Sequence, residues 1–203
     1  MRNISLAFKV SSFLYWNMHE RGHGRYLDAA GGYGILTRIM RDFGFDFYWA
    51  DKYCSNIMAR GFEYAHHLKG CCAVTAMEVM EHLVDPLAFV RESLEVAGAD
   101  TLLFTTELFE RDPPELDWLY YAFPSGQHIG FFTKLSLEVL GRRLGMHFYT
   151  ANGLHILSRR MFNQTCLQWS THPWMTKMSF FCVTRRRLKS KTMQDHRFMT
   201  GSQ

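Results

Sequence analysis

The chain lacks the cysteine patterns that hold secreted domains together or bind structural zinc. Its five cysteines are an odd number, none has the Cys-x-x-Cys spacing, and the adjacent Cys71 and Cys72 are poorly placed to bridge each other. This argues against a disulfide framework and against a cysteine zinc site. Reduced thiols are typical of the cytoplasm, so we expect a cytoplasmic protein. The remaining cysteines are Cys54, Cys166 and Cys182.

Long apolar runs are also absent. A charge-free window of 16 residues runs from Trp118 to Thr133, but it contains Pro124 and two glycines. A spanning helix needs about 20 apolar residues, so we expect no membrane span. The N-terminal apolar stretch carries Lys9 and has no small-residue cleavage site, so we expect no signal peptide.

Basic charge is scarce outside the C-terminal tail. The formal net charge is +4, yet residues 184–203 alone carry +5, so the rest of the chain is close to neutral. A nucleic-acid-binding domain is expected to carry a basic stripe across its folded body. Nucleic acid is therefore a disfavoured partner, and a small-molecule or glycan substrate is favoured. We expect residues 185–203 to form a solvated tail, and the sequence does not specify an oligomeric state.

The pattern that is present alternates strands with helices. A strand over 25–28, a glycine-rich turn, a helix over 35–43 and a strand over 45–50 form a β-α-β unit. This order predicts an α/β fold, Rossmann-like and doubly wound, with a mostly parallel sheet in a single domain. We further expect helices over 3–20, 86–96 (capped by Asp85) and 132–144 (capped by Thr133), strands over 71–76, 101–106, 147–150 and 154–158, and a candidate strand over 180–184.

The turn after the first strand is the first candidate site. Asp28 ends that strand, and Ala30, Gly31, Gly32, Tyr33 and Gly34 follow. Glycines let a backbone approach a ligand closely, and Asp51, 23 residues after Asp28, is placed to accept ribose hydroxyls. A carboxylate before the turn favours a nucleoside with an ammonium group, S-adenosylmethionine, over NAD. A glycine-rich turn without a ligand is the alternative.

Three stretches together resemble class I S-adenosylmethionine-dependent methyltransferases, in a broad bacterial branch of which some members act on glycans. They are YLDAAGGYGILTRIMRDFGFDFYWADKY at 26–53, CCAVTAMEVMEHLVDPLAFVRE at 71–92, and the stretch from Trp118 to Leu157 with its GQHI motif. The resemblance implies a seven-stranded sheet whose last strand is antiparallel. It divides the chain into an N-terminal helical segment (1–24), a methyltransferase domain (25–160) and a C-terminal extension with a basic tail (161–203).

The same resemblance implies roles for individual residues. Asp28 would face the methionine ammonium, Gly32 and Gly34 would let the cofactor pass, and Asp51 would bind the ribose. Two departures stand out: Ala30 replaces the first glycine of the usual motif, and only about 20 residues lie between Asp51 and Cys71, so the third strand is short. The implied cofactor-binding set is Asp28, Ala30, Gly31, Gly32, Tyr33, Gly34, Asp51, Lys52, Thr75, Ala76 and Glu78.

A second candidate site is the run from Glu78 to His82. Glu78, Glu81 and His82 are spaced i, i+3, i+4, which places them on one side of a helical turn, and His128 is a candidate fourth ligand from a loop. This set suits Mg²⁺ or Mn²⁺. It resembles the metal site of some small-RNA 2′-O-methyltransferases. The alternatives are a metal-free base at His82 or His128, supported by Glu81, and a purely structural cap.

These observations lead to one main hypothesis. We expect a methyltransferase that methylates an oxygen of a small polar acceptor such as a sugar or glycan hydroxyl. Trp118, Tyr120 and Tyr121 are candidates for the wall of the acceptor site. The alternatives are 2′-O-methylation of an RNA 3′-terminal ribose, and a domain that binds S-adenosylmethionine without turnover.

Overall fold

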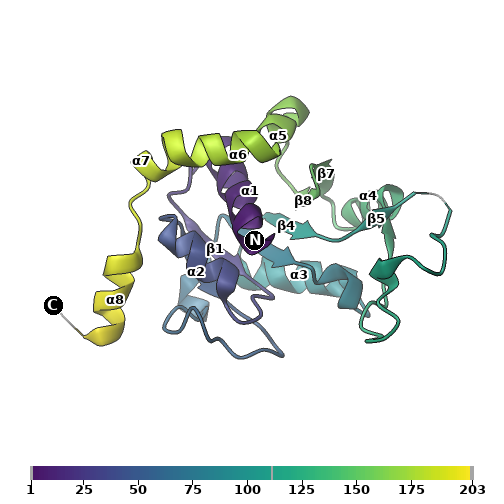
Figure 1. The fold of residues 1–203 in the computed structure, drawn as a ribbon, viewed down its shortest axis with the longest axis horizontal. Coiled ribbons are helices and arrows are strands. Elements are labelled where there is room, and N and C mark those ends of the chain that lie inside the picture. Colours follow the sequence, from purple (N-terminus) through teal and green to yellow (C-terminus); the bar gives the residue numbers. More distant parts are fainter. Residues whose placement is uncertain (1, 111, 202–203) are drawn as a thin grey trace.

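The central feature of the protein is a six-stranded twisted sheet, seen in a computed structural model that describes residues 2–110 and 112–201. Its strand order is β2-β1-β3-β4-β8-β7 (Figure 1). β8 runs antiparallel to both of its neighbours, and the other neighbouring pairs are parallel. The strands are β1 (Arg25–Asp28), β2 (Asp46–Trp49), β3 (Ala73–Met77), β4 (Thr101–Thr105), β7 (His147–Ala151) and β8 (Leu154–Ser158).

The Rossmann-like α/β fold and the antiparallel last strand are thus confirmed, but the expected count of seven strands is wrong. The sheet that the described residues form ends at β2. Beyond it, the chain makes a single parallel bridge between Trp49 and Glu63, followed by the short helix η1 (His66–Leu68). Asp51 and Asn56 accept hydrogen bonds from the backbone nearby, which stabilises turns here instead of an extended strand.

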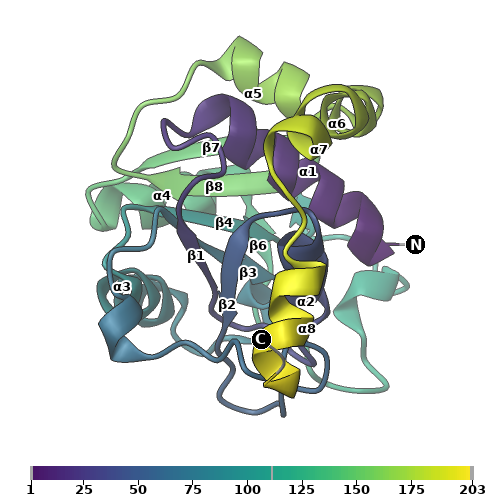
Figure 2. The same ribbon diagram turned by 90° about the vertical axis from the view of Figure 1, so that its left-hand side faces the viewer.

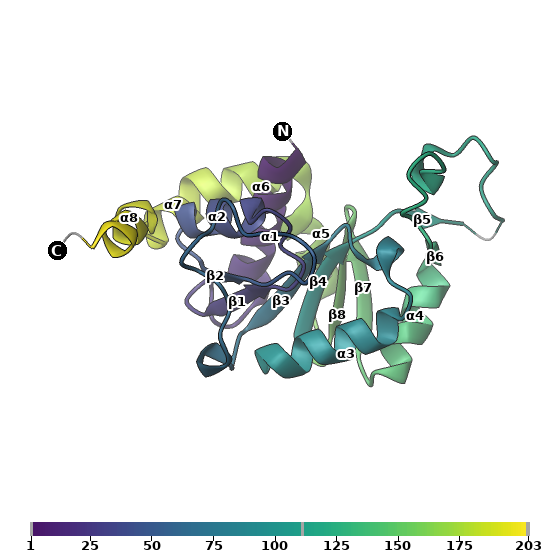
Figure 3. The ribbon, with the colours of Figure 1, turned by 90° about the horizontal axis from the view of Figure 1, so that it is seen from below.

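Helices cover both faces of the sheet (Figure 3). One face carries α1 (Arg2–Asn17), α2 (Ile35–Asp42), α5 (Gln164–Thr171) and α6 (Pro173–Ser179), and the other carries α3 (Pro86–Ala97) and α4 (Lys134–Arg143). Each face has its own buried apolar cluster. The Asp85 and Thr133 side chains cap α3 and α4 as expected, accepting from the backbone N–H groups of Ala88 and Ser136.

An arm leaves the sheet after β4. The two-residue strands β5 (Leu108–Phe109) and β6 (Phe132–Thr133) pair with each other and bracket a long loop that contains η3 (Leu119–Tyr121). The loop projects from the body of the protein (Figure 3). Its return segment lies on the turn η2 (Met80–His82), because the N–H groups of Ile129 and Gly130 donate to the Glu81 carbonyl.

Most residues of the expected solvated tail are exposed, Arg185, Arg186 and Arg187 among them, but their backbone is largely helical. The candidate strand over 180–184 is the π-helical turn η4 (Phe180–Thr184), which leads into α7 (Arg185–Arg187). α8 (Thr192–Thr200) then packs beside α2 and β2 (Figure 2). None of the described helices has the length and apolar character that crossing a membrane requires.

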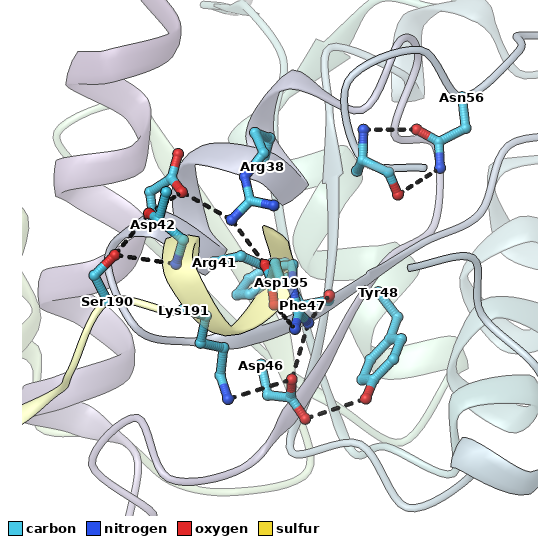
Figure 4. A network of polar contacts seen from close by, with 12 residues as sticks. Arg38, Arg41, Asp42, Asp46, Phe47, Tyr48, Asn56, Ser190, Lys191 and Asp195 are labelled. Atoms are coloured by element: carbon cyan, nitrogen blue, oxygen red, sulfur yellow. Dashed lines mark hydrogen bonds and ion pairs between the residues drawn. The ribbon is translucent and has the colours of Figure 1, made fainter. Parts of the chain in front are cut away.

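A buried ion pair holds α8 in place (Figure 4). Asp195 is 1% exposed, and its carboxylate accepts from Arg41 Nε and Nη2, both at 2.8 Å, with Arg38 Nη2 also at 2.8 Å. The Arg41 guanidinium also donates to Asp46 and to the Phe47 carbonyl, each at 2.9 Å. Burial alone would raise the pKa of Asp195, but the two arginines lower it below its usual value.

We expect Asp195→Asn to destabilise the protein by about 3 kcal/mol, because it leaves the buried Arg41 guanidinium with only the partly exposed Asp46 as counter-charge. The midpoint of denaturant unfolding at neutral pH measures this. Asp42→Asn is the matched control, since it removes an exposed partner of Arg38 and should cost less than about 1 kcal/mol. Equal midpoints for the two variants would contradict an anchoring role for Asp195.

Candidate functional site

The glycine-rich turn joins the carboxyl end of β1 to the start of α2. Gly31 N–H donates to the Ala50 carbonyl at 3.1 Å, which ties the turn to the end of β2. A Cβ on Gly31 would lie 2.3 Å from Trp49 Cδ1, so no larger residue fits there. Gly34 caps α2 with φ +85°, a conformation that favours glycine. A Cβ on Gly32 would meet no atom within 4 Å, so this part of the turn faces open space.

Asp28 lies beneath the turn and is 2% exposed. Thr75 Oγ1 on β3 donates to its carboxylate at 2.8 Å, and Thr37 Oγ1 on α2 donates at 3.2 Å. Burial raises the pKa of Asp28 to about 6, although the two threonine hydroxyls oppose the shift. No cationic side chain among the described residues pairs with this carboxylate, and a positively charged ligand group beside it would favour its ionised form.

The Asp51 carboxylate accepts hydrogen bonds from several backbone N–H groups around it. The donors are Gly32 N–H at 2.9 Å, Tyr53 N–H at 2.7 Å and Cys54 N–H at 2.8 Å. A carboxylate has about four lone-pair sites, so roughly one remains for a ligand hydroxyl. Its neighbour Lys52 is exposed, with its ammonium 5.5 Å from the centre of the Tyr53 ring.

A cleft of about 390 Å³ opens above the turn, within the size range of small-molecule sites. Six residues of the cofactor set line it: Asp28, Ala30, Gly31, Gly32, Tyr33 and Glu78. Thr75 instead supports Asp28 from below, Ala76 is buried in the cluster under α3, Gly34 caps α2, and Asp51 and Lys52 lie outside the lining.

The sequence analysis missed the part of the cleft that α1 contributes. Asn3, Leu6 and Lys9 line it. Lys9 donates to the Asn152 carbonyl in the turn between β7 and β8, and burial lowers the pKa of its ammonium. No local signal marks these residues, because only the packing of α1 over the sheet brings them here. Thr105, Thr106 and Glu107 were also missed, although the rule that ligands bind at the carboxyl ends of parallel strands would have found them.

Glu78 follows β3 in a strained conformation, with φ +56°. Its N–H approaches the Thr105 carbonyl at 3.3 Å and the Thr105 hydroxyl at 3.1 Å, and its Oε1 accepts from that hydroxyl at 2.6 Å. This left-handed backbone interrupts the helical turn that the spacing had implied. Glu78 therefore faces the cleft, separate from Glu81 and His82.

The structure brings together Glu81, His82 and His128, whose ligand atoms all lie within 4.8 Å of one another. His82 Nδ1 donates to the Gln127 carbonyl at 2.9 Å, and His128 Nδ1 donates to the Tyr120 carbonyl. Because carbonyls only accept, each neutral ring keeps Nε2 as its unprotonated nitrogen. Glu78, the fourth expected ligand, is not part of this cluster.

Glu81 is 1% exposed, and neither of its carboxylate oxygens has a donor in hydrogen-bonding geometry among the residues described. An uncompensated buried carboxylate is costly, so a proton or a cation would stabilise it. Burial raises the pKa of the nearby Tyr120 hydroxyl, and the Glu81 charge adds to the shift. Tyr120 also bonds to Thr106 and to Glu107 N–H, both at 3.0 Å, which connects the cluster to the cleft.

The three expected wall residues form one aromatic cluster on the arm. The Trp118 ring lies 5.1 Å from that of Tyr120 and 5.2 Å from that of Tyr121. Tyr120 also contacts His128, with 4.5 Å between ring centres. A larger hollow of about 640 Å³ lies elsewhere, between α3 and α4, and none of the expected site residues lines it. Size therefore does not identify the site, whereas the chemistry of the lining does.

Comparison with known proteins gives a family and a fold. A family model described as "Methyltransferase domain" matches residues 9–149. No curated protein matches the chain. Among solved structures, the methyltransferase domain of bacterial CtHen1 is 16% identical with a TM-score of 0.50, and the alignment covers 78% of this chain and 100% of that one.

Two other solved structures are similar at the same level. TnmH is 15% identical with a TM-score of 0.49, and the alignment covers 77% of this chain but only 56% of TnmH. The magnesium protoporphyrin IX methyltransferase ChlM from Synechocystis PCC 6803, solved with bound S-adenosylhomocysteine, is 13% identical with a TM-score of 0.46, and the alignment covers 77% of this chain and 82% of that one. At these identities the structural likeness concerns the fold alone.

Proposed function

Because this chain belongs to the methyltransferase-domain family and is a class I S-adenosylmethionine-dependent methyltransferase, we propose that it methylates a hydroxyl oxygen of a small polar acceptor, such as a sugar or glycan. The observation that carries this proposal is the buried Glu81 carboxylate, which two histidines accompany and which Tyr120 connects to the cleft. A carboxylate and two imidazoles beside a cofactor cleft are groups that can orient and deprotonate a hydroxyl.

The cleft has the charges that S-adenosylmethionine requires. Asp28 would bind the ammonium of the methionine part, and Lys9, at the same cleft, would bind its carboxylate. Asp51 would bind one ribose hydroxyl through its remaining lone pair, and Gly32 leaves room for the cofactor to pass. When bound, S-adenosylmethionine supplies an electrophilic methyl group, which an acceptor oxygen must approach in line.

The chemistry of the cluster fits a divalent metal. Glu81 offers oxygens, and the Nε2 atoms of His82 and His128 are unprotonated because Nδ1 is the donor in each ring. One carboxylate with two imidazoles favours Mn²⁺ over Mg²⁺, since imidazole is a borderline ligand and Mg²⁺ prefers oxygen. A divalent ion there would lower the pKa of an acceptor hydroxyl.

The same cluster would also suit general-base catalysis without a metal. His82 is exposed, and its Nε2 is free to take the proton of an acceptor hydroxyl while Nδ1 holds the ring against the Gln127 carbonyl. His128 is the other candidate for this base. In this case Glu81 would support the histidines without binding a metal, and a metal would make no difference to turnover.

The charge of the arm supports a small acceptor more than RNA. Residues 107–117 contain five carboxylates and one arginine in the sequence, and the first of them, Glu107, lines the cleft. A polyanion would be repelled there. Methylation of an RNA 3′-terminal ribose remains the second candidate, because the sequence motif from Glu78 to His82, with His128, resembles the metal site of small-RNA methyltransferases. Three of these four residues form the cluster. Steep salt dependence of acceptor binding would identify RNA. The carboxylates are Glu107, Glu110, Asp112, Glu115 and Asp117.

We expect the affinity for S-adenosylhomocysteine to fall by about tenfold as the pH is lowered from 7 to 5. The pKa of Asp28 is about 6 without ligand, so below that pH the carboxyl is neutral and no longer pairs with the ligand ammonium. Calorimetric titration at each pH measures this. Adenosine, which lacks the ammonium, is the matched control and should bind equally at both values. A flat profile for S-adenosylhomocysteine would exclude the assigned role of Asp28.

We expect Mn²⁺ to bind the cofactor-loaded protein, and both Glu81→Gln and His128→Ala to weaken it by more than about tenfold. Paramagnetic resonance of Mn²⁺ measures the binding directly, whether or not an acceptor is known. Glu78→Gln is the matched control, because Glu78 lies outside the cluster and should not alter Mn²⁺ affinity. Chelation should likewise abolish turnover. If wild-type protein does not bind Mn²⁺, the metal proposal fails and the base at His82 or His128 remains.

A further inference from the structure

The C-terminal extension contains one unbroken helical segment, residues 173–187, formed by α6, η4 and α7. Its inner side packs against α1. The Trp16 indole donates to Ser179 Oγ at 2.6 Å, and the rings of Phe8 and Phe180 are 5.1 Å apart. Thr176 and Thr184 are buried on the same inner side. The segment is therefore fixed to the body of the protein, and its opposite side faces solvent.

The solvent-facing side carries large apolar groups, which we call the outer stripe: Trp174, Met178 and Phe181. Phe181 lies at the edge of this side, with its ring 5.9 Å from that of Phe8 on α1. Their spacing of i, i+4 and i+7 places them on one face of a helix. Trp174 is 80% exposed, and Met178 and Phe181 are each 53% exposed. Single exposed apolar side chains are ordinary, but three in line on one helix leave a continuous apolar strip in water.

The charge around the outer stripe has one sign. From Arg159 to Gln194 the sequence contains eight lysines and arginines and no aspartate or glutamate. Lys177 flanks the stripe, and Arg185, Arg186, Arg187 and Lys189 follow its end. Within the described chain, none of these five has an ion-pair partner within 4.0 Å. Their charge is thus available to an anionic surface.

We propose that residues 173–189 bind the surface of an anionic lipid bilayer, with the helix lying in the plane of the headgroups. An apolar strip ending in Trp and Phe would enter the boundary between headgroups and acyl chains, and the cations would contact anionic headgroups. Tryptophan favours this boundary because its ring is apolar and its N–H is polar. The attachment is peripheral, in agreement with the absence of a spanning helix among the described residues.

A lipid surface explains this face better than a nucleic acid does. Four of these five cations are concentrated at one end of the segment, and only Lys177 lies beside the apolar middle, whereas nucleic-acid surfaces distribute cations along the phosphate path. The stripe also includes Met178, which has no ring to stack on a base.

Co-sedimentation with vesicles tests the proposal on the full chain. We expect binding to vesicles of phosphatidylcholine with about a quarter phosphatidylserine, and much weaker binding to pure phosphatidylcholine. The triple variant Arg185→Gln, Arg186→Gln, Arg187→Gln should lower the partition coefficient about a hundredfold, since each cation contributes about a factor of five. Trp174→Ala combined with Phe181→Ala should also lower it, and thermal melting should confirm that both variants fold.

Matched controls place the changes elsewhere on the surface. Leu119→Ala removes an apolar side chain that is 94% exposed on the arm, and Arg142→Gln removes an exposed cation on α4. Neither should alter vesicle binding. The proposal would be overturned if the protein bound neither kind of vesicle, or if the control variants lost as much vesicle binding as the stripe and arginine variants. Binding of single-stranded RNA through the same residues without vesicle binding would also overturn it, as would self-association that the stripe substitutions abolish without vesicle binding.

Discussion

The carboxylate of Asp28 is the point at which the first strand, its neighbour and the first sheet helix meet. Thr75 on β3 and Thr37 on α2 donate to it, and the Asp28 carbonyl accepts from Ala50 N–H beyond β2. The two hydroxyls donate hydrogen bonds to the carboxylate, but no cationic side chain among the described residues neutralises its charge. Burial therefore raises its pKa to about 6. Above that pH the folded protein must hold a buried charge that an unfolded chain would hydrate. The buried charge thus lowers the free energy of unfolding, and a ligand cation bound beside Asp28 would offset that loss.

The end of β4 joins this charged cleft to the second cluster. Thr105 holds Glu78 at the cleft, and the next residue, Thr106, bonds to the Tyr120 hydroxyl. The Tyr120 carbonyl in turn accepts from His128, which lies beside His82 and Glu81. Because residues at the end of β4 contact both groups, this strand end would help to set the distance between cofactor and acceptor.

Local signals in the sequence were sufficient for the parts of the fold that local interactions form. The β1-turn-α2-β2 unit, the Asp85 and Thr133 caps and the placement of Asp28 all depend on neighbours within a few residues or on adjacent strands. α8 depends on an ion pair between Arg41 and Asp195, 154 positions apart, which no local pattern reveals. Glu78 was expected in both the cofactor set and the metal cluster. It lies apart from Glu81 and His82 because the i, i+3, i+4 rule holds only for helical backbone, and its positive φ interrupts the helix. Lys9 was missed because its role depends on how α1 packs over the sheet.

The titration of the Asp28 carboxyl is the most direct test of the central claim, that the cleft presents an uncompensated carboxylate to a cationic ligand group. Carbon-13 nuclear magnetic resonance of that carboxyl should give a pKa near 6 in the free protein and a lower pKa with S-adenosylhomocysteine bound. Thr75→Val should raise the free value further, because it removes a hydrogen bond to the ionised form. A free pKa at the ordinary value of 3.8, unchanged by the ligand, would contradict the account.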